Sequence, residues 1–237
     1  MSNLIYIDSK DRSIGNSSIF NIVVDDLITN SKKEISVESV IIPKSFYAIN
    51  TNNQTFLLNA TTVTLAVGNY TAAQFKTEIE AKMTATAIDT YTWALDTITG
   101  KSTITAANLA FTITSNERNL RYLGLPASTV ASSTLLGLKS TNVVDLASSR
   151  YIDIVLDGIG MASTNTYNKN KNVLARVYAN VANFDTIYFT SSTFSYISIY
   201  TDKLERLQLS VVDDFGDLLD LNGSDISITL ATRISMD

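Results

Sequence analysis

Residues 207–230 read LQLSVVDDFGDLLDLNGSDISITL and combine a clear strand pattern with a dense group of carboxylates. Apolar residues alternate with polar ones at both ends of this stretch, at Leu207, Leu209, Val211, Ile226, Ile228 and Leu230. A period of two is typical of β-strands that bury one face. Two long strands are therefore predicted, and the connection between them carries the aspartates Asp213, Asp214, Asp217, Asp220 and Asp225.

This aspartate-rich connection has to be weighed as a metal site. An EF-hand loop needs oxygen ligands at alternate positions before a glycine and a glutamate six residues after it. When the stretch is aligned on Gly223, the first ligand position falls on Leu218 and the last on Thr229. Turn chemistry explains the residues better: a turn at 213–216, a short strand at 218–221 and a two-residue hairpin at 222–223. No metal ligand is predicted.

The residue inventory excludes several kinds of active site. The 237 residues include no cysteine and no histidine, so disulfides, thiolate metal sites, His-based zinc sites and Ser-His-Asp triads cannot form. The net charge is −5, and no basic cluster is longer than Lys32-Lys33. Nucleic acid is therefore not expected as a partner, because phosphate binding needs a concentrated basic face. No apolar run of about 20 residues predicts a membrane span, and we expect a soluble, unanchored protein.

Carboxylates alone can support glycoside hydrolysis, so the glutamates need separate attention. There are six, namely Glu34, Glu38, Glu78, Glu80, Glu117 and Glu205. Each has a simpler role as a solvated charge, and Glu78 and Glu80 are expected on the exposed part of a helix. A sugar-binding module would favour exposed aromatic residues, but Trp93 is the one tryptophan and the tyrosines fall mostly on predicted strands. We predict no enzyme, and no catalytic, cofactor-binding or metal-binding residue.

Alternation continues through most of the chain and predicts an all-β protein. Further strands are expected at 20–24, 35–38, 54–58, 62–66, 150–157, 173–180, 185–190 and 194–201. The chain has only two prolines, so little obstructs central strands. Many short strands of this kind indicate a sandwich or barrel.

One stretch, GNYTAAQFKTEIEAKM at 68–83, predicts a helix instead. Thr71 and Gln74 form a capping box, Tyr70 and Phe75 occupy the staple positions, and an apolar stripe continues through Ile79. A hairpin is expected next, from Tyr91–Asp96 to Ser102–Ala106 around Gly100, then a strand at 109–114 and a short helix at 116–123. Residues 126–149 are expected to form a loop.

The helix and hairpin form an α+β module inside a β protein. The strands before it are too few to close a sandwich, but together with those after residue 150 they number about eight, as in a jelly roll. We therefore predict a discontinuous jelly-roll domain at 1–60 and 146–237, with an α+β insertion at 61–145.

Several motifs resemble the minor capsid and penton proteins of virophages, Polinton-like elements and large eukaryotic DNA viruses. They are IYIDSKDRSIGNSSIFNIVV (5–24), ISVESVIIPKSFYAINTNNQTF (35–56), GNYT (68–71), Leu123-Gly124-Leu125, IDIVLDGIG (152–160) and LQLSVVDDFGDLLDLNGSDISITLATRI (207–234). The motifs lie at both ends of the chain and in the insertion. The resemblance therefore covers most of the sequence.

The resemblance implies a single jelly roll with strands B to I and the insertion between strands D and E. Strands B, C and D would lie between residues 19 and 66, and strands E to I between 150 and 234. It further implies a homopentamer at the fivefold vertices of an icosahedral capsid, beside trimers of the major capsid protein. The protein would be made in the host cytoplasm and reside in the virion, and the insertion is a candidate for contact with a host receptor or glycan.

The apolar patch 4–7 lies ahead of the first strand that this alignment assigns, which suggests an N-terminal arm at 1–18 that reaches under a neighbouring capsomer. Two other functions fit the composition. A trimeric viral or phage adhesin or fibre domain is also β-rich and rich in Ser, Thr and Asn, and a carbohydrate-active enzyme ranks third.

Overall fold

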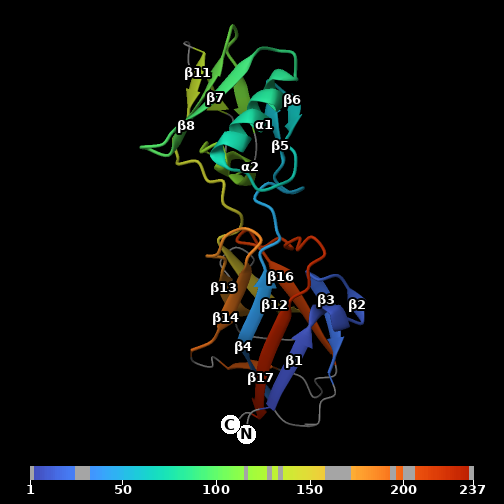
Figure 1. The fold of residues 1–237 in the computed structure, drawn as a ribbon. Helices are drawn as coiled ribbons and strands as arrows, with labels where there is room; N and C mark the ends of the chain where they lie inside the picture. Colours follow the sequence, from blue (N-terminus) through green and yellow to red (C-terminus); the bar gives the residue numbers. More distant parts are fainter. Residues whose placement is uncertain are drawn as a thin grey trace. The chain divides into compact units, whose positions relative to one another are not determined.

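The computed structural model describes residues 3–24, 33–114, 117–126, 130–132, 136–157, 172–192, 196–199 and 206–234. The chain folds as two compact units (Figure 1). The first contains Met1–Phe46 and Ser149–Asp237, and the second contains Tyr47–Ser148. Each unit has a hydrophobic core of its own.

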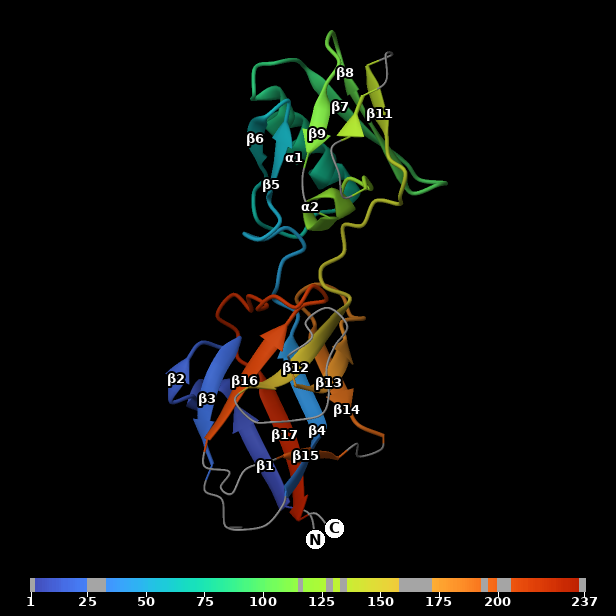
Figure 2. The ribbon, with the colours of Figure 1, turned by 180° about the vertical axis from the view of Figure 1, so that it is seen from behind.

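The first unit is a sandwich of two antiparallel sheets (Figures 1 and 2). One sheet has the order β1-β17-β4-β14, and β15 also pairs with β4. Its strands are β1 (Asn3–Asp8), β4 (Lys33–Pro43), β14 (Thr186–Thr190), β15 (Ile197–Ile199) and β17 (Ser227–Ile234). The other sheet has the order β13-β12-β16-β3-β2. Its strands are β2 (Ile14–Gly15), β3 (Ile19–Val23), β12 (Tyr151–Asp157), β13 (Val173–Tyr178) and β16 (Arg206–Val212).

The strand order is that of a jelly roll. Lettered in chain order, β1 is strand B, β3 is C, β4 is D, β12 is E, β13 is F, β14 with β15 is G, β16 is H and β17 is I. The two sheets then read BIDG and CHEF. The predicted fold class is confirmed, and the second unit is inserted between strands D and E.

Strand B lies earlier in the chain than the alignment with the family suggested. Asn3–Asp8 pairs along its length with β17, with Ile5 opposite Leu230 and Ile7 opposite Ile228. Ile7 is buried in the core of the sandwich. The hypothesis of an N-terminal arm is therefore wrong for these residues. The patch looks isolated in sequence because its partner strand is at the other end of the chain.

In its described residues, the second unit contains two small sheets and two helices. One sheet has the order β10-β9-β5-β6 and the other β11-β8-β7. The strands are β5 (Thr55–Leu58), β6 (Thr61–Thr64), β7 (Tyr91–Asp96), β8 (Lys101–Ala106), β9 (Thr112–Thr114), β10 (Val130–Ala131) and β11 (Gly137–Lys139). The helices are α1 (Ala72–Thr84) and α2 (Glu117–Arg121). The hairpin of β7 and β8 is confirmed, and Gly100 adopts a positive φ of 68° in its turn.

Helix α1 forms as its local sequence predicts. The Thr71 side chain accepts from the N–H of Gln74, and the Gln74 side chain accepts from the N–H of Thr71, so the capping box is complete. The buried face consists of Phe75, Ile79 and Met83. Tyr70 stands edge-on to Phe75, with 6.3 Å between ring centroids, which confirms the hydrophobic staple.

The second unit begins before the boundary expected at residue 61. Strand β5 pairs with β6 and β9, and Phe56 and Leu58 are buried in the core of the second unit. Residues 47–60 therefore belong to this unit, although the sequence placed them with the jelly roll. In the segment expected to be a loop, Gly137–Lys139 is strand β11 and pairs with β8. A strand of three residues is too short to show an alternating pattern.

The carboxylate of Asp89 links two segments of the second unit and makes its stability depend on pH. Burial raises the pKa of Asp89, but N–H donors of Asn108, Thr90 and Leu109 and the Asn108 side chain outweigh this and lower the pKa to about 2. Because the folded pKa lies below the ordinary value of 3.8, the stabilisation is complete above about pH 4 and is lost as the pH falls towards 2.

In thermal unfolding between pH 6 and pH 2, Asp89→Ala should lower stability at pH 6 and flatten the acid dependence. Asp11→Ala, at an exposed site, should leave that dependence unchanged, and parallel curves for the native chain and Asp89→Ala would refute this role.

Candidate assembly surface

The aspartates of residues 213–220 bind their own backbone. Asp213 Oδ1 accepts from the N–H groups of Phe215 and Asp217, at 2.9 and 2.8 Å. The N–H of Gly216 donates to the Asp213 carbonyl, and Gly216 has a φ of 82°. Asp220 Oδ1 accepts from the N–H of Asn222 at 2.8 Å. The turn predicted at 213–216 is confirmed, and these carboxylates satisfy backbone donors.

Asn222 and Gly223 form the predicted turn, but not a hairpin. Both have positive φ, 49° and 79°, and the N–H of Ser224 donates to the Leu221 carbonyl. The turn joins no paired strands, however, because β16 and β17 lie in different sheets. The short strand expected at 218–221 contributes only an isolated bridge between Leu218 and Val212. The Asn-Gly sequence determined the turn. The segment around it runs from one sheet to the other, so the turn does not connect paired strands.

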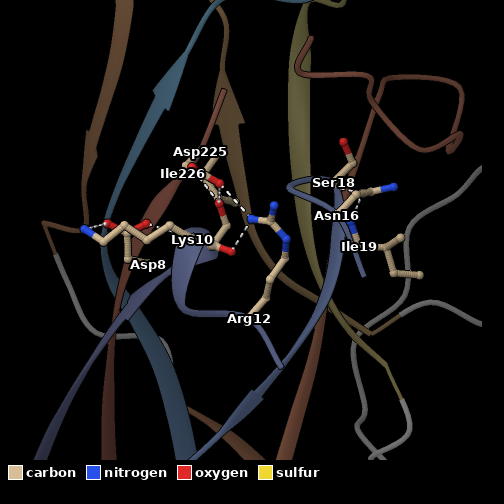
Figure 3. Close-up of polar contacts among 9 residues, drawn as sticks. Asp8, Lys10, Arg12, Asn16, Ser18, Ile19, Asp225 and Ile226 are labelled. Carbon is tan, nitrogen blue, oxygen red and sulfur yellow. Dashed lines mark hydrogen bonds and ion pairs between the residues drawn. The ribbon is translucent and has the colours of Figure 1, made fainter. Parts of the chain in front are cut away.

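The last aspartate of the stretch ties the two ends of the chain together (Figure 3). Asp225 Oδ1 accepts from Ser9 Oγ at 2.7 Å and from Arg12 Nη1 at 3.0 Å. Ser9 Oγ in turn accepts from the N–H of Ile226 at 3.0 Å, and Ser9 belongs to the 3₁₀ turn η1 (Ser9–Asp11) that follows strand B. Asp225 therefore anchors the exit of β1 to the start of β17.

The glutamates considered for catalysis hold the fold together where the structure describes them. Glu78 accepts from the N–H of Ala66, and Glu80 accepts from Lys76 and from the N–H of Trp93. Both are half-buried, so their expected exposure was wrong. Glu34 pairs with Arg233. Glu38 is half-buried on β4, Glu205 lies outside the described residues, and Glu117 lies in α2.

Three further observations bear on other kinds of site. In the part of the chain that the structure describes, no three acidic side chains gather as they would around a metal ion. Trp93 is buried in the second core and is not a surface platform for a sugar. Neither helix of the described ranges has the length and apolar character needed to cross a bilayer.

The jelly roll has two lateral sides, each formed by the edge strands of both sheets. Strands β13 and β14 are joined by residues 179–185, which we call the β13–β14 loop, and together they form one side. Strands β1 and β2 are joined through η1 and form the other side. Figures 1 and 2 show β13 and β14 across the sandwich from β2. Edge strands leave backbone donors and acceptors free to pair with another chain.

Large aromatic side chains are exposed on the β13–β14 side. Tyr188 on β14 is 75% exposed, Phe184 in the loop 73%, and Tyr178 on β13 66%. Ile41 is opposite Tyr188 in the register and is also exposed, so the apolar surface continues onto β4. Tyr, Phe and Trp are enriched at protein interfaces, where a rigid ring buries much area at little entropic cost.

The β1–β2 side is also apolar. Tyr6 on β1 is 77% exposed. Leu4 on the same strand and Ile14 on β2 are also exposed. Val23, at the end of β3, is exposed as well. Both lateral sides of the sandwich thus present apolar groups of the kind that mark interaction surfaces.

A buried lysine holds the β13–β14 loop in place. The Lys44 Nζ donates to the carbonyls of Ala179 and Val181, at 3.0 and 2.6 Å, and burial lowers the Lys44 pKa. The Lys44 backbone also donates to the Asp185 carbonyl and accepts from the N–H of Phe184. Phe184 adopts a φ of 71°, which is costly for a residue with a side chain. These bonds hold the backbone of the loop at Phe184, whose side chain is exposed.

Sequence reasoning did not identify these surface residues, although a signal was present. Ile5 and Ile7 face inward on β1, and Ile187 and Phe189 face inward on β14. The residue between each pair is a tyrosine, which alternation places on the outer face. Phe184 carries no such signal, because its exposure follows from the loop conformation.

The chain resembles known proteins in fold and not in sequence. No family model matches the sequence, and no curated protein matches it. Among solved structures, the mavirus penton protein has a TM-score of 0.53 and 10% sequence identity, over 99% of this chain and 100% of that chain. A chain of the Sputnik virophage particle, solved by electron cryo-microscopy, has a TM-score of 0.47 and 14% identity, over 97% of each chain. From end to end, the chain has the fold of the mavirus penton protein.

Proposed function

We propose that this chain is a structural protein of a virion, a penton capsomer that assembles as a homopentamer at the fivefold vertices of an icosahedral capsid. The observation that carries the proposal is the likeness to the mavirus penton protein over the whole chain, through both the jelly roll and the unit inserted between strands D and E. A structural role also agrees with the acidic residues described above, which bind backbone N–H groups and basic side chains of the same chain.

The two lateral sides of the jelly roll support a ring. A closed homopentamer needs a heterologous interface, in which one surface of a subunit contacts a different surface of the next. The β13–β14 side and the β1–β2 side are such a pair, since both are apolar and lie on opposite sides of the sandwich. In the proposed ring, the β13–β14 side of each subunit packs against the β1–β2 side of its neighbour.

In the capsid, each pentamer would contact the surrounding trimers of the major capsid protein. The second unit, which has its own core and is inserted in a single connection between strands, would be the part that contacts a host receptor or glycan. The protein would be synthesised in the host cytoplasm and reside in the virion.

Native mass spectrometry and electron microscopy of the purified chain test the proposal. We expect a species of five chains that appears as a fivefold ring. A trimer would favour an adhesin or fibre domain instead. A chain that stays monomeric at high concentration and cleaves glycans would refute both structural roles.

A substitution on the β13–β14 side tests the proposed interface. Tyr188→Arg replaces an exposed aromatic ring with a charge, and removing an aromatic anchor from an interface typically costs about 2 kcal/mol or more. Since about 1.4 kcal/mol is a factor of ten, each contact in the ring should weaken at least about thirtyfold. Native mass spectrometry over a concentration series would detect the loss of the pentamer.

The matched control is Ile98→Arg, because Ile98 is 94% exposed in the turn between β7 and β8 of the second unit. This variant should assemble like the native chain. A Tyr188→Arg variant that also assembles normally would exclude Tyr188 from the interface.

A further inference from the structure

The β13–β14 loop presents one apolar group on a rigid base. Phe184 stands out from the loop, while its own N–H and the carbonyl of the next residue are bound to the backbone of the buried Lys44. The loop therefore offers an exposed aromatic ring on a backbone that hydrogen bonds hold in place.

A cavity of about 370 Å³ lies elsewhere on the jelly roll. It is lined by Arg12, Asn16, Ser17, Ser18, Leu218, Leu219, Asp220 and Gly223. Leu218 and Leu219 make part of it apolar, and Gly223 leaves open space where a side chain would extend. A closed cavity of about 150 Å³ already holds a benzene ring. The volume is therefore ample for a phenylalanine side chain and part of the loop that carries it.

Arg12 supplies the cavity with a group suited to an aromatic ring. Its Nη1 donates to the Ser9 carbonyl and to Asp225, which holds the guanidinium in place. Its Nε and Nη2 donate to none of the described residues. Figure 3 shows the Arg12 guanidinium in contact with Asp225, and it also shows Asn16 and Ser18, which line the same cavity. A guanidinium attracts the face of an aromatic ring, and the carboxylate of Asp225 already balances the charge of this one.

Phe184 and the cavity lie at the same end of the sandwich. Thr186 is opposite Pro43, so the loop lies where β4 ends. The cavity segment 218–223 lies between the end of β16 and the start of β17. The start of β17 pairs with the end of β4, where Ser227 is opposite Ile41. The cavity residues 12–18 come from the connection of β1 to β3, on the side away from the loop.

Rotation about a ring axis parallel to the strands leaves the height along that axis unchanged. An aromatic ring on one side and a cavity at the same height on the other side can therefore meet in every contact of a closed ring. We propose that Phe184 of each subunit inserts into the cavity lined by Arg12, Leu218 and Asp220 of the neighbouring subunit, with its ring against the guanidinium of that Arg12. This inference rests on the proposed homopentamer and specifies its contact.

Cysteine cross-linking tests the contact without removing Phe184. The chain has no cysteine, so the exposed residues Asn183 in the loop and Asp11, next to the cavity residue Arg12, can be replaced as a clean pair. Purified Asn183→Cys, Asp11→Cys protein, joined with a short bismaleimide, should give a ladder that ends at five chains on a denaturing gel. Addition of Phe184→Ala to the pair should lower the yield of the ladder at least fivefold. The control pair Asn183→Cys, Asn3→Cys should give no ladder, because Asn3 is exposed at the opposite end of β1.

Native mass spectrometry on the same samples tests the homopentamer separately from the loop–cavity contact. A pentamer that does not cross-link through the loop–cavity pair would overturn the contact and leave the proposed function standing. A ladder undiminished by Phe184→Ala would also overturn it, since another group would then fill the cavity. A protein that forms no pentamer would refute the proposed function, and the contact with it.

Discussion

Replacing Phe75 with alanine is expected to destabilise the second unit by about 3–5 kcal/mol, the usual cost of truncating a buried phenylalanine. Phe75 is fully buried at the centre of an aromatic cluster. Its ring stands edge-on to Trp93 and Tyr122, with centroids 5.2 and 5.6 Å away, as well as to Tyr70. The substitution removes these contacts and leaves a cavity that the surrounding strands cannot fill. Small domains are marginally stable, so a loss of this size approaches their whole stability.

The effect should be confined to the second unit, because the two cores share no residue. In calorimetry, the transition of the second unit should move to lower temperature or disappear, and that of the jelly roll should remain. The variant should still form pentamers, since the proposed contacts all lie on the jelly roll. Ile98→Ala, at a solvent-exposed position of the same unit, should leave both transitions unchanged. A single transition that shifts as a whole would show that the units do not unfold independently.

Gly15→Ala is expected to cost about 4 kcal/mol, through backbone strain and steric overlap together. Gly15 has a φ of 104°, a conformation that residues with side chains rarely adopt. A Cβ at this position would lie 2.1 Å from the Ile19 carbonyl oxygen and 2.9 Å from the Phe20 Cα. Both are backbone atoms of the paired strand β3, so neither can move without breaking the pairing of β2 with β3. Urea unfolding of the purified variant measures the loss.

Gly223 is the matched comparison, since its φ of 79° is also positive but a Cβ at this position would have no atom within 4 Å. Gly223→Ala should therefore cost only the strain of the left-handed conformation, roughly 1–2 kcal/mol. Equal losses at the two glycines would show that steric overlap at Gly15 is relieved by backbone movement. From sequence, Gly223 is the more prominent of the two because it follows Asn222. The structure makes Gly15 the more demanding position.

Local signals predicted the elements that depend on neighbouring residues. The capping box of Thr71 and Gln74 identified the start of α1, and Gly100 identified the turn of the hairpin. The residues that interact in these elements are only a few positions apart in the chain, so a short stretch of sequence shows both partners. The outline of a jelly roll with an insertion was predictable too, since alternation marked most of its strands.

Long-range pairing determined what could not be predicted. Strand B was assigned too late in the chain, because only the pairing with β17 shows that residues 3–8 belong to the sheet. Residues 47–60 were assigned to the wrong side of the boundary, because β5 alternates equally well in either core. The candidate surface depends on the same kind of information, since Tyr6 and Tyr188 become interface candidates only once β1 and β14 are known to be edges.

By itself, the sequence determined the all-β class, the helix in the insertion, and the exclusion of histidine and cysteine chemistry. It also determined that the aspartates after β16 would shape turns, because an Asx carboxylate binds N–H groups only a few residues away. Only the tertiary structure decided that Asp225 joins the two ends of the chain, that Lys44 holds the loop of Phe184, and that this ring and the cavity beside Arg12 lie at one end of the sandwich. Those relations join residues far apart in the chain, and only the folded backbone brings them together.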